Sequence, residues 1–361
     1  MPRASPPSLH GELRFAQLAS GARIAWAASG QGAAHEPPLV RVAHWMTHVE
    51  HDASSPLWHP WLERLGRSLR LIRYDERGCG SSSADGTPPG LPAALEELEA
   101  VVDASGHERV ALLGLSGACG PAVAYAAKHP QRVTHLVLHG GYTHGLRLRS
   151  PSREALAFHD AQVQLMALGW GRPDSAVQQF FTASMLPDAT PAQAAALNAQ
   201  QRLSCSGERA AAILSARADL DIRPLLPQIT CPTLVLHSEG DAVVPLEQGR
   251  MLASAIAGAR FETLHSRNHI PLAGEPAFDR FCEAVTRFIS VDAPEAARFT
   301  PRERELLDAM ARGLDNLQIA AHLGLADKTV RNTLSLLYGK LGVEGRPQAI
   351  VRAREMGFGR V

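Results

Sequence analysis

Three residues whose types together perform nucleophilic catalysis follow one another along the chain: Ser116, Asp241 and His269. A serine hydroxyl becomes a nucleophile when a histidine takes its proton and a carboxylate orients that histidine. Ser116 lies in residues 114–118 (GLSGA), between an apolar run and a helical pattern. Small neighbours allow such a serine to occupy a strained turn from strand to helix, with its hydroxyl projecting from a sheet. Asp241 and His269 each follow an apolar run of strand character, so we expect all three at one sheet edge.

Strands and helices alternate along the part of the chain that must position these residues. We expect a central strand beginning at residue 110, with further strands over 13–18, 23–28, 39–43, 71–74, 133–139, 233–237 and 261–264. Helical spacing is found over 61–69, 91–105, about 117–129, 246–257 and 278–289. This alternation predicts an α/β fold with a mostly parallel sheet covered on both faces. Residues 141–226 interrupt it with helical patterns over 154–168, 175–185 and 191–203, and we interpret them as a helical cap.

Length and composition limit the class of protein. A chain of 361 residues predicts two domains. Its formal charge is zero, but residues 299–361 hold ten lysines and arginines against seven acids, a local charge of +3 that hints at nucleic-acid contact. The five cysteines are scattered without a CxxC pair, which indicates a reduced protein without disulfides. Without a signal peptide or a long apolar run, we expect a cytoplasmic protein and no membrane partner.

Residues from about 13 to 289 resemble the α/β-hydrolase fold. Residues 74–81 (YDERGCGS) resemble that family's D-x-R-G-x-G-x-S turn, and Asp241 and His269 stand in its acid and histidine signatures, in the chain order serine, acid, histidine. The resemblance implies that Ser116 is the nucleophile, His269 the general base and Asp241 its orienting partner. The residues implied to offer backbone N–H groups to an oxyanion hole are Gly117, Trp45 and Met46.

Two positions depart from the hydrolase pattern. Ala118 replaces the last glycine of the serine turn, and Trp45 brings an indole to the loop where the family usually has glycine. The triad therefore has two open interpretations, catalysis or ligand binding alone. Asp75 and Arg77 are expected to form a buried pair that fixes their turn. Loop histidines near residues 44–51 match no metal motif, and we predict no metal and no cofactor.

The C-terminal stretch predicts a separate, all-helical module. Thr300 is an expected N-cap, with Glu303 three residues later, and that first helix is expected to end at Gly313. A short helix over 317–322 capped by Asn316, a third over about 327–337 and a fourth over 347–355 follow. Two helices joined by a tight turn are typical of proteins that place the second helix in the major groove of DNA.

This module closely resembles the LuxR-type helix-turn-helix. The matching runs are residues 300–305 (TPRERE), 316–320 (NLQIA), 328–332 (KTVRN) and 340–343 (KLGV). The resemblance implies that the third helix reads double-stranded DNA. The residues implied to contact DNA are Lys328, Thr329, Arg331, Asn332 and Arg346. The alternative is a protein-interaction module with a solvated basic face.

Three positions of this module depart from the LuxR pattern. Ala326 stands where a capping serine is usual, Thr333 replaces a common histidine, and Gly339 weakens the end of the third helix. These departures are expected to alter the DNA sequence read or to lower affinity.

Together the motifs predict a domain over 1–290, a linker over 291–299 and a DNA-binding domain over 300–361. The first hypothesis is a transcriptional regulator, expected to be a homodimer, whose hydrolase-like domain senses a small-molecule ligand; whether it also hydrolyses that ligand slowly is left open. The alternative is an active serine hydrolase, esterase-like, whose helix-turn-helix localises or regulates it.

Overall fold

The computed structural model describes residues 11–32, 36–44, 47–173, 176–290 and 299–359. The chain divides into two compact units, Met1–Thr286 and Arg287–Val361. The first unit holds all the strands found in the described residues, and the second is helical. Both architectures confirm the predicted fold class.

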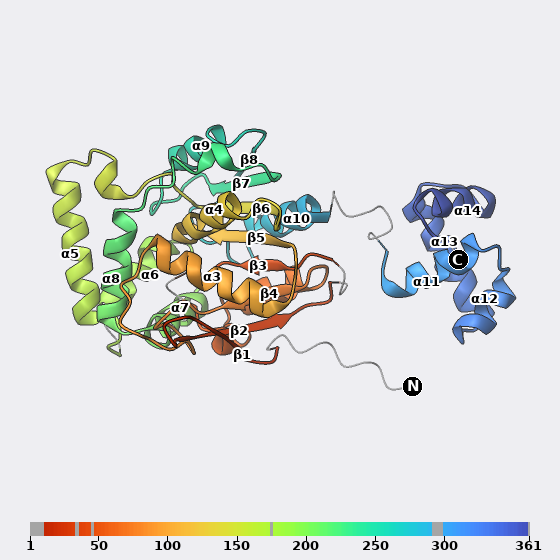
Figure 1. Cartoon of the computed structure of the whole chain (residues 1–361), viewed down its shortest axis with the longest axis horizontal. Coiled ribbons are helices and arrows are strands. Elements are labelled where there is room, and N and C mark those ends of the chain that lie inside the picture. Colours follow the sequence, from red (N-terminus) through yellow and green to blue (C-terminus); the bar gives the residue numbers. More distant parts are fainter. Residues whose placement is uncertain (1–10, 33–35, 45–46, 174–175, 291–298, 360–361) are drawn as a thin grey trace. The chain divides into compact units, whose positions relative to one another are not determined.

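An eight-stranded sheet forms the centre of the first unit (Figure 1). The strand order is β1-β2-β4-β3-β5-β6-β7-β8; β1 with β2 and β2 with β4 pair antiparallel, and the remaining pairs are parallel. The bounds are β1 Arg14–Gln17, β2 Arg23–Ser29, β3 Leu39–Arg41, β4 Leu71–Tyr74, β5 Val110–Leu115, β6 Val133–His139, β7 Thr233–Ser238 and β8 Arg260–Leu264. Every residue of the central strand β5 is buried, which requires cover on both faces.

Helices cover both faces of this sheet. One cluster joins Leu98 of α3 and Leu252 of α9 to strand residues that include Leu138 of β6. The next residue of β6, His139, points to the opposite face, where its ring lies 5.3 Å from that of Phe281 in α10. The helices outside the cap are α1 Val49–Asp52, α2 His59–Gly66, α3 Leu91–Ser105, α4 Cys119–Lys128, α9 Leu246–Ser254 and α10 Pro276–Ser290.

Four helices form the cap, one more than the sequence predicted. They are α5 Arg153–Gly169, α6 Ala176–Met185, α7 Pro191–Ser204 and α8 Gly207–Ala218, and Figure 1 shows them grouped at one end of the sheet. Several hydrogen bonds join the cap to the sheet unit, among them two that involve α7. Gln200 Nε2 of α7 donates to Asp52 Oδ1 at 3.0 Å, and Gly80 N donates to Ser204 O at 2.6 Å. Asp52 is fully buried and also pairs with Arg41 of β3.

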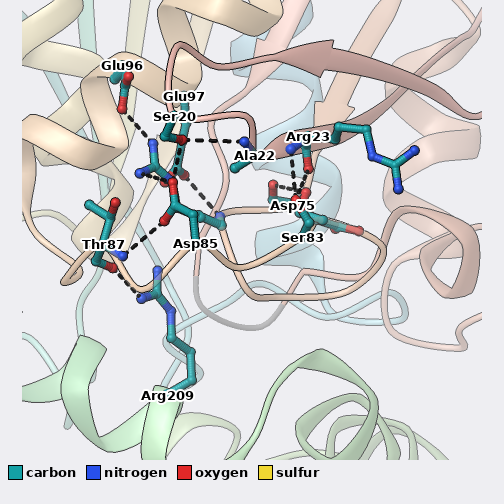
Figure 2. A network of polar contacts seen from close by, with 12 residues as sticks. Ser20, Ala22, Arg23, Asp75, Ser83, Asp85, Thr87, Glu96, Glu97 and Arg209 are labelled. Atoms are coloured by element: carbon teal, nitrogen blue, oxygen red, sulfur yellow. Dashed lines mark hydrogen bonds and ion pairs between the residues drawn. The ribbon is translucent and has the colours of Figure 1, made fainter.

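The turn after β4 differs from the expected Asp75–Arg77 pair. Asp75 accepts hydrogen bonds from the backbone N–H groups of Val49 and Ser81. Arg77 instead pairs with three other acids, Asp85, Glu96 and Glu97, at 3.0, 2.5 and 3.3 Å. Figure 2 shows these three acids gathered away from Asp75. The expected pair was wrong for two reasons. Helix α3 brings the carboxylates of Glu96 and Glu97 to Arg77, and backbone N–H groups donate to Asp75 in place of the arginine.

The second unit packs four helices around one small core. They are α11 Pro301–Ala311, α12 Asn316–Leu323, α13 Asp327–Leu341 and α14 Arg346–Glu355. The predicted capping box at Thr300 and Glu303 is confirmed. Asn316 was the wrong cap for α12, because Asp315 accepts from Gln318 N in its place. The helix α13 continues four residues beyond the predicted end, through Gly339.

Within the described ranges, none of the helices combines the length and apolar character that a membrane span requires.

Candidate active site and nucleic-acid interface

Ser116 lies at the turn between β5 and α4, as the sequence predicted. Its φ is +53°, in the left-handed region that side-chain-bearing residues rarely adopt, and residues with such strained backbone cluster at functional sites. The turn also requires glycine at position 114, where a Cβ atom would lie 2.8 Å from Cys119 Cα. Ala118 is buried in the core cluster, so the methyl group that departs from the family pattern is accommodated.

Asp241 and His269 are brought together by the loops after β7 and β8. His269 Nδ1 lies 2.6 Å from Asp241 Oδ2, and both side chains are buried. Asp241 Oδ1 accepts from the N–H groups of Val243 and Val244 at 2.8 and 3.0 Å. Burial alone would raise the pKa of Asp241, but His269 and these two amides hold that pKa below its ordinary value. The carboxylate therefore stays ionised and orients the imidazole ring.

The other nitrogen of His269, Nε2, is buried and has no hydrogen-bond partner among the described residues. It faces a small cavity whose lining includes Ser116, His44, His139 and Met185. The cavity has a volume of about 10 Å³, room for about one water molecule. The three predicted triad residues thus meet at one site, whose cavity as described is large enough for about one water molecule.

His139 is a second histidine of this site, and sequence reasoning missed it. Its Nε2 lies 2.9 Å from the backbone oxygen of His269, and burial lowers its pKa to about 3. A neutral imidazole at this position donates to that carbonyl and holds the His269 backbone in place. No motif signals this role, because the contact joins residues 130 positions apart.

The predicted oxyanion-hole donors are described only in part. Trp45 and Met46 lie outside the described residues. Gly117 follows Ser116 and lies beside Arg217 of α8, since a Cβ atom on Gly117 would be 2.8 Å from Arg217 Cδ and Nε. Arg217 was not predicted as a site residue, because α8 itself was not predicted. Among the described residues, no cluster of His, Cys, Asp or Glu side chains could hold a metal ion.

The helix α13 separates its side chains as a DNA-reading helix requires. Val330, Leu334 and Leu337 are buried in the core of the second unit. The residues predicted to contact DNA from this helix are exposed: Lys328, Thr329, Arg331 and Asn332. Arg331 also pairs with Asp327 one turn earlier, which positions its guanidinium. Their contact with DNA stays a prediction.

Arg346, the remaining predicted DNA contact, has partners within its own unit. Its Nη1 donates to Asn316 Oδ1 at 2.8 Å, and its Nη2 donates to the backbone oxygen of Leu314. The side chain therefore joins the start of α14 to the start of α12. Any DNA contact by Arg346 would use its remaining N–H groups.

Comparison with known proteins finds two families in one chain. Residues 50–276 match the family model of the alpha/beta hydrolase fold, and residues 297–353 match that of the bacterial regulatory proteins of the luxR family. RutD of Caulobacter sp., named as a carbamate hydrolase, is 27% identical over 249 residues, which cover 66% of this chain and 88% of RutD. A hydrolase structure from Pseudomonas aeruginosa has 27% identity and a TM-score of 0.64, covering 78% of this chain and 99% of that chain.

The second family match is to regulators. The DNA-binding transcriptional activator DevR/DosR of Mycobacterium tuberculosis is 51% identical over 57 residues. That match covers 16% of this chain and 26% of the regulator.

Proposed function

The chain belongs to the alpha/beta hydrolase fold family and carries a luxR-family regulatory domain, and on this premise we propose that its first domain controls DNA binding in response to a small molecule. The ligand binds over Ser116, beneath the cap. The exposed basic face of α13 is the observation that carries the regulatory half of the proposal. The geometry of Ser116, Asp241 and His269 supports a ligand site in the first domain.

Ligand entry changes the position of the cap in this mechanism. The small cavity over Ser116 supports this step, since a ligand of several atoms needs more room there and Met185 of the cap forms part of its wall. Cap movement then changes how two copies of the chain pack, and with it the spacing of their α13 helices. Dimeric helix-turn-helix proteins bind half-sites about one helical turn, ~34–36 Å, apart. A ligand acts only through its different affinity for the two states.

A homodimer in the cytoplasm is part of the proposal. Val351 of α14 is 58% exposed, although Ala353 of the same helix is buried. An exposed apolar residue on this helix supports its use in dimerisation. The proposal retains domains over 1–290, with a cap over about 141–226, and 300–361, joined by a linker over 291–299. Light scattering of the purified chain at micromolar concentration should give twice the monomer mass.

DNA binding is tested with fragments from the gene's own genomic neighbourhood, by fluorescence anisotropy over a series of salt concentrations. Arg331→Ala is expected to weaken binding about ten-fold and, if it removes a phosphate contact, to reduce the salt slope by about one. Arg312→Ala is the matched control, because Arg312 forms the same i,i+4 pair with Asp308 but lies at the end of α11. Equal losses in both variants would refute the assigned role of α13.

The second candidate function is serine hydrolysis, favoured by the Asp241–His269 hydrogen bond beside Ser116. Ser116 would attack an ester carbonyl while His269 Nε2 takes its proton. A fluorophosphonate probe should then label the wild-type chain and not Ser116→Ala. Absence of both labelling and aryl-ester turnover would remove this candidate and leave ligand binding alone. Slow hydrolysis is compatible with regulation, because it destroys the ligand and resets the sensor.

A further inference from the structure

A second cavity adjoins the one over Ser116. Ala43 and Gly117 line it, and their neighbours in the sequence, His44 and Ser116, line the first cavity. Its volume is about 50 Å³. Most of its wall is apolar, formed by Leu91, Ala94, Pro121, Ile213 and Leu220. The charged side chains of this wall are Glu76 and Arg217.

Arg217 lies where the two cavities meet. Its Cδ and Nε atoms are 2.8 Å from the position of a Cβ atom on Gly117, so the side chain crosses the backbone directly after the nucleophile. Its positive charge also contributes, after burial and Arg41, to holding the pKa of His44 well below the ordinary value. Its side chain is 19% exposed, so the guanidinium is largely removed from water.

The contact of Arg217 with Glu76 is long. Arg217 Nη2 lies 3.5 Å from Glu76 Oε2, near the outer limit of a hydrogen bond. A guanidinium carries five N–H donors in a planar fork that matches two carboxylate oxygens. A contact of this length is weak, so a ligand carboxylate can compete with Glu76 for the guanidinium.

The charges around the cavity leave a positive excess. Both Arg217 and Arg209 act on the single carboxylate of Glu76. Arg209 also comes from α8 and donates to the backbone oxygen of Thr87 at 3.1 Å (Figure 2). Glu97 is a second carboxyl group close to Glu76. Burial, and to a smaller extent the charge of Glu76, raise the pKa of Glu97 to about 8, so it is mostly protonated at pH 7. Two arginines thus act on the carboxylate of Glu76 beside an apolar pocket, where an anion is stabilised more than in water.

We propose that Arg217 binds a carboxylate group of the ligand, while the ligand's apolar segment lies against the cavity wall and its other end reaches Ser116. The ligand class is accordingly a small organic acid with a short apolar chain. This inference rests on the proposed function only in placing the ligand over Ser116. It adds a residue of the cap that determines ligand specificity. Ligand binding is thereby coupled to the position of α8.

The test is calorimetric titration of the full chain, without DNA, with linear carboxylates from butyrate to octanoate and their primary amides. The wild-type chain should bind the best carboxylate about ten- to a hundred-fold more tightly than its amide. This ratio corresponds to the free energy that a hydrogen bond between charged groups contributes. Arg217→Gln should abolish that preference, and Arg217→Lys should keep part of it, since the charge remains without the fork. Glu76→Gln should tighten carboxylate binding by removing the competing group.

Arg147→Gln is the matched control, because Arg147 makes a comparable pair with Asp219 just beyond the end of α8. It should leave the preference unchanged. The inference would be overturned if the wild-type chain bound acids and amides equally, or bound neither. It would also be overturned if Arg217→Gln and Arg147→Gln reduced the preference for the acid equally. A preference that Arg217→Gln abolishes, with no effect of the acid on DNA affinity, would instead refute the sensing mechanism and leave the carboxylate site standing.

Discussion

Two glycines of the regulatory domain should respond in opposite directions to the same substitution. Gly339 lies inside α13, and a Cβ atom there would meet nothing within 4 Å. Gly324 ends α12 with φ +63°, and a Cβ atom there is equally free of contacts. The two sites therefore differ in backbone conformation and share the same open surroundings.

The magnitudes follow from that difference. Alanine is favoured over glycine in a helix interior by about 1 kcal/mol, so Gly339→Ala should stabilise the domain by about that amount. Alanine in the left-handed region costs roughly 1–2 kcal/mol, so Gly324→Ala should destabilise it. For a domain of 60–100 residues, 1 kcal/mol corresponds to a shift in Tm of about 4–8 °C.

The assay is differential scanning calorimetry of the full chain, with hydrogen exchange of peptides from residues 300–359 to assign the transition. Gly339→Ala should raise the Tm of that transition and slow exchange in α13. Gly324→Ala should lower the Tm. Shifts of the same sign, or a loss of stability in Gly339→Ala, would refute the view that the last turn of α13 is ordinary exposed helix.

Three further predictions concern polar groups that have hydrogen-bond partners within the protein. Asp241→Asn should reduce any aryl-ester turnover by about 10³- to 10⁴-fold, because His269 loses its orienting carboxylate; an unchanged rate would exclude the pair from catalysis. Glu97→Gln should flatten the pH dependence of the urea midpoint. The folded chain retains the Glu97 proton up to a pKa of about 8, against an ordinary value of 4.5, so wild-type stability falls as pH rises through that window. Arg346→Ala should lower the unfolding free energy of the regulatory domain by about 1–2 kcal/mol, because it removes hydrogen bonds to Asn316 and Leu314; unchanged stability in urea would contradict this.

Hydrophobic periodicity and chain order predicted most of the fold. The strand at 71–74 and the helix at 91–105 have the predicted bounds, and the turn at Ser116 follows the predicted strand. The serine turn could be recognised because strained backbone demands small neighbours, a local property of the sequence. The meeting of Asp241 with His269 was predictable because parallel strands place their carboxyl ends at one edge.

The missed elements have weaker local signals. The helix α8 buries mainly alanines, Ala210, Ala211 and Ala218, which contribute little to hydrophobic periodicity. Arg217 was missed with it. The cap of α12 was displaced by one residue because Asp315 and Asn316 are both good caps. Arg77 was assigned the wrong partner, because spacing alone does not show which acids α3 brings to it.

The hydrogen bond from Gln200 to Asp52 affects how the sensor can report ligand concentration. Asp52 is buried and paired with Arg41, so lifting α7 leaves a charge pair short of a hydrogen bond inside the protein. Intermediate positions of the cap are then unfavourable. In them Asp52 has lost the hydrogen bond from the Gln200 amide and has not yet gained one from water. In the proposed mechanism each molecule is accordingly either closed or open. Rising ligand concentration would increase the fraction of open molecules, and transcription would follow that fraction.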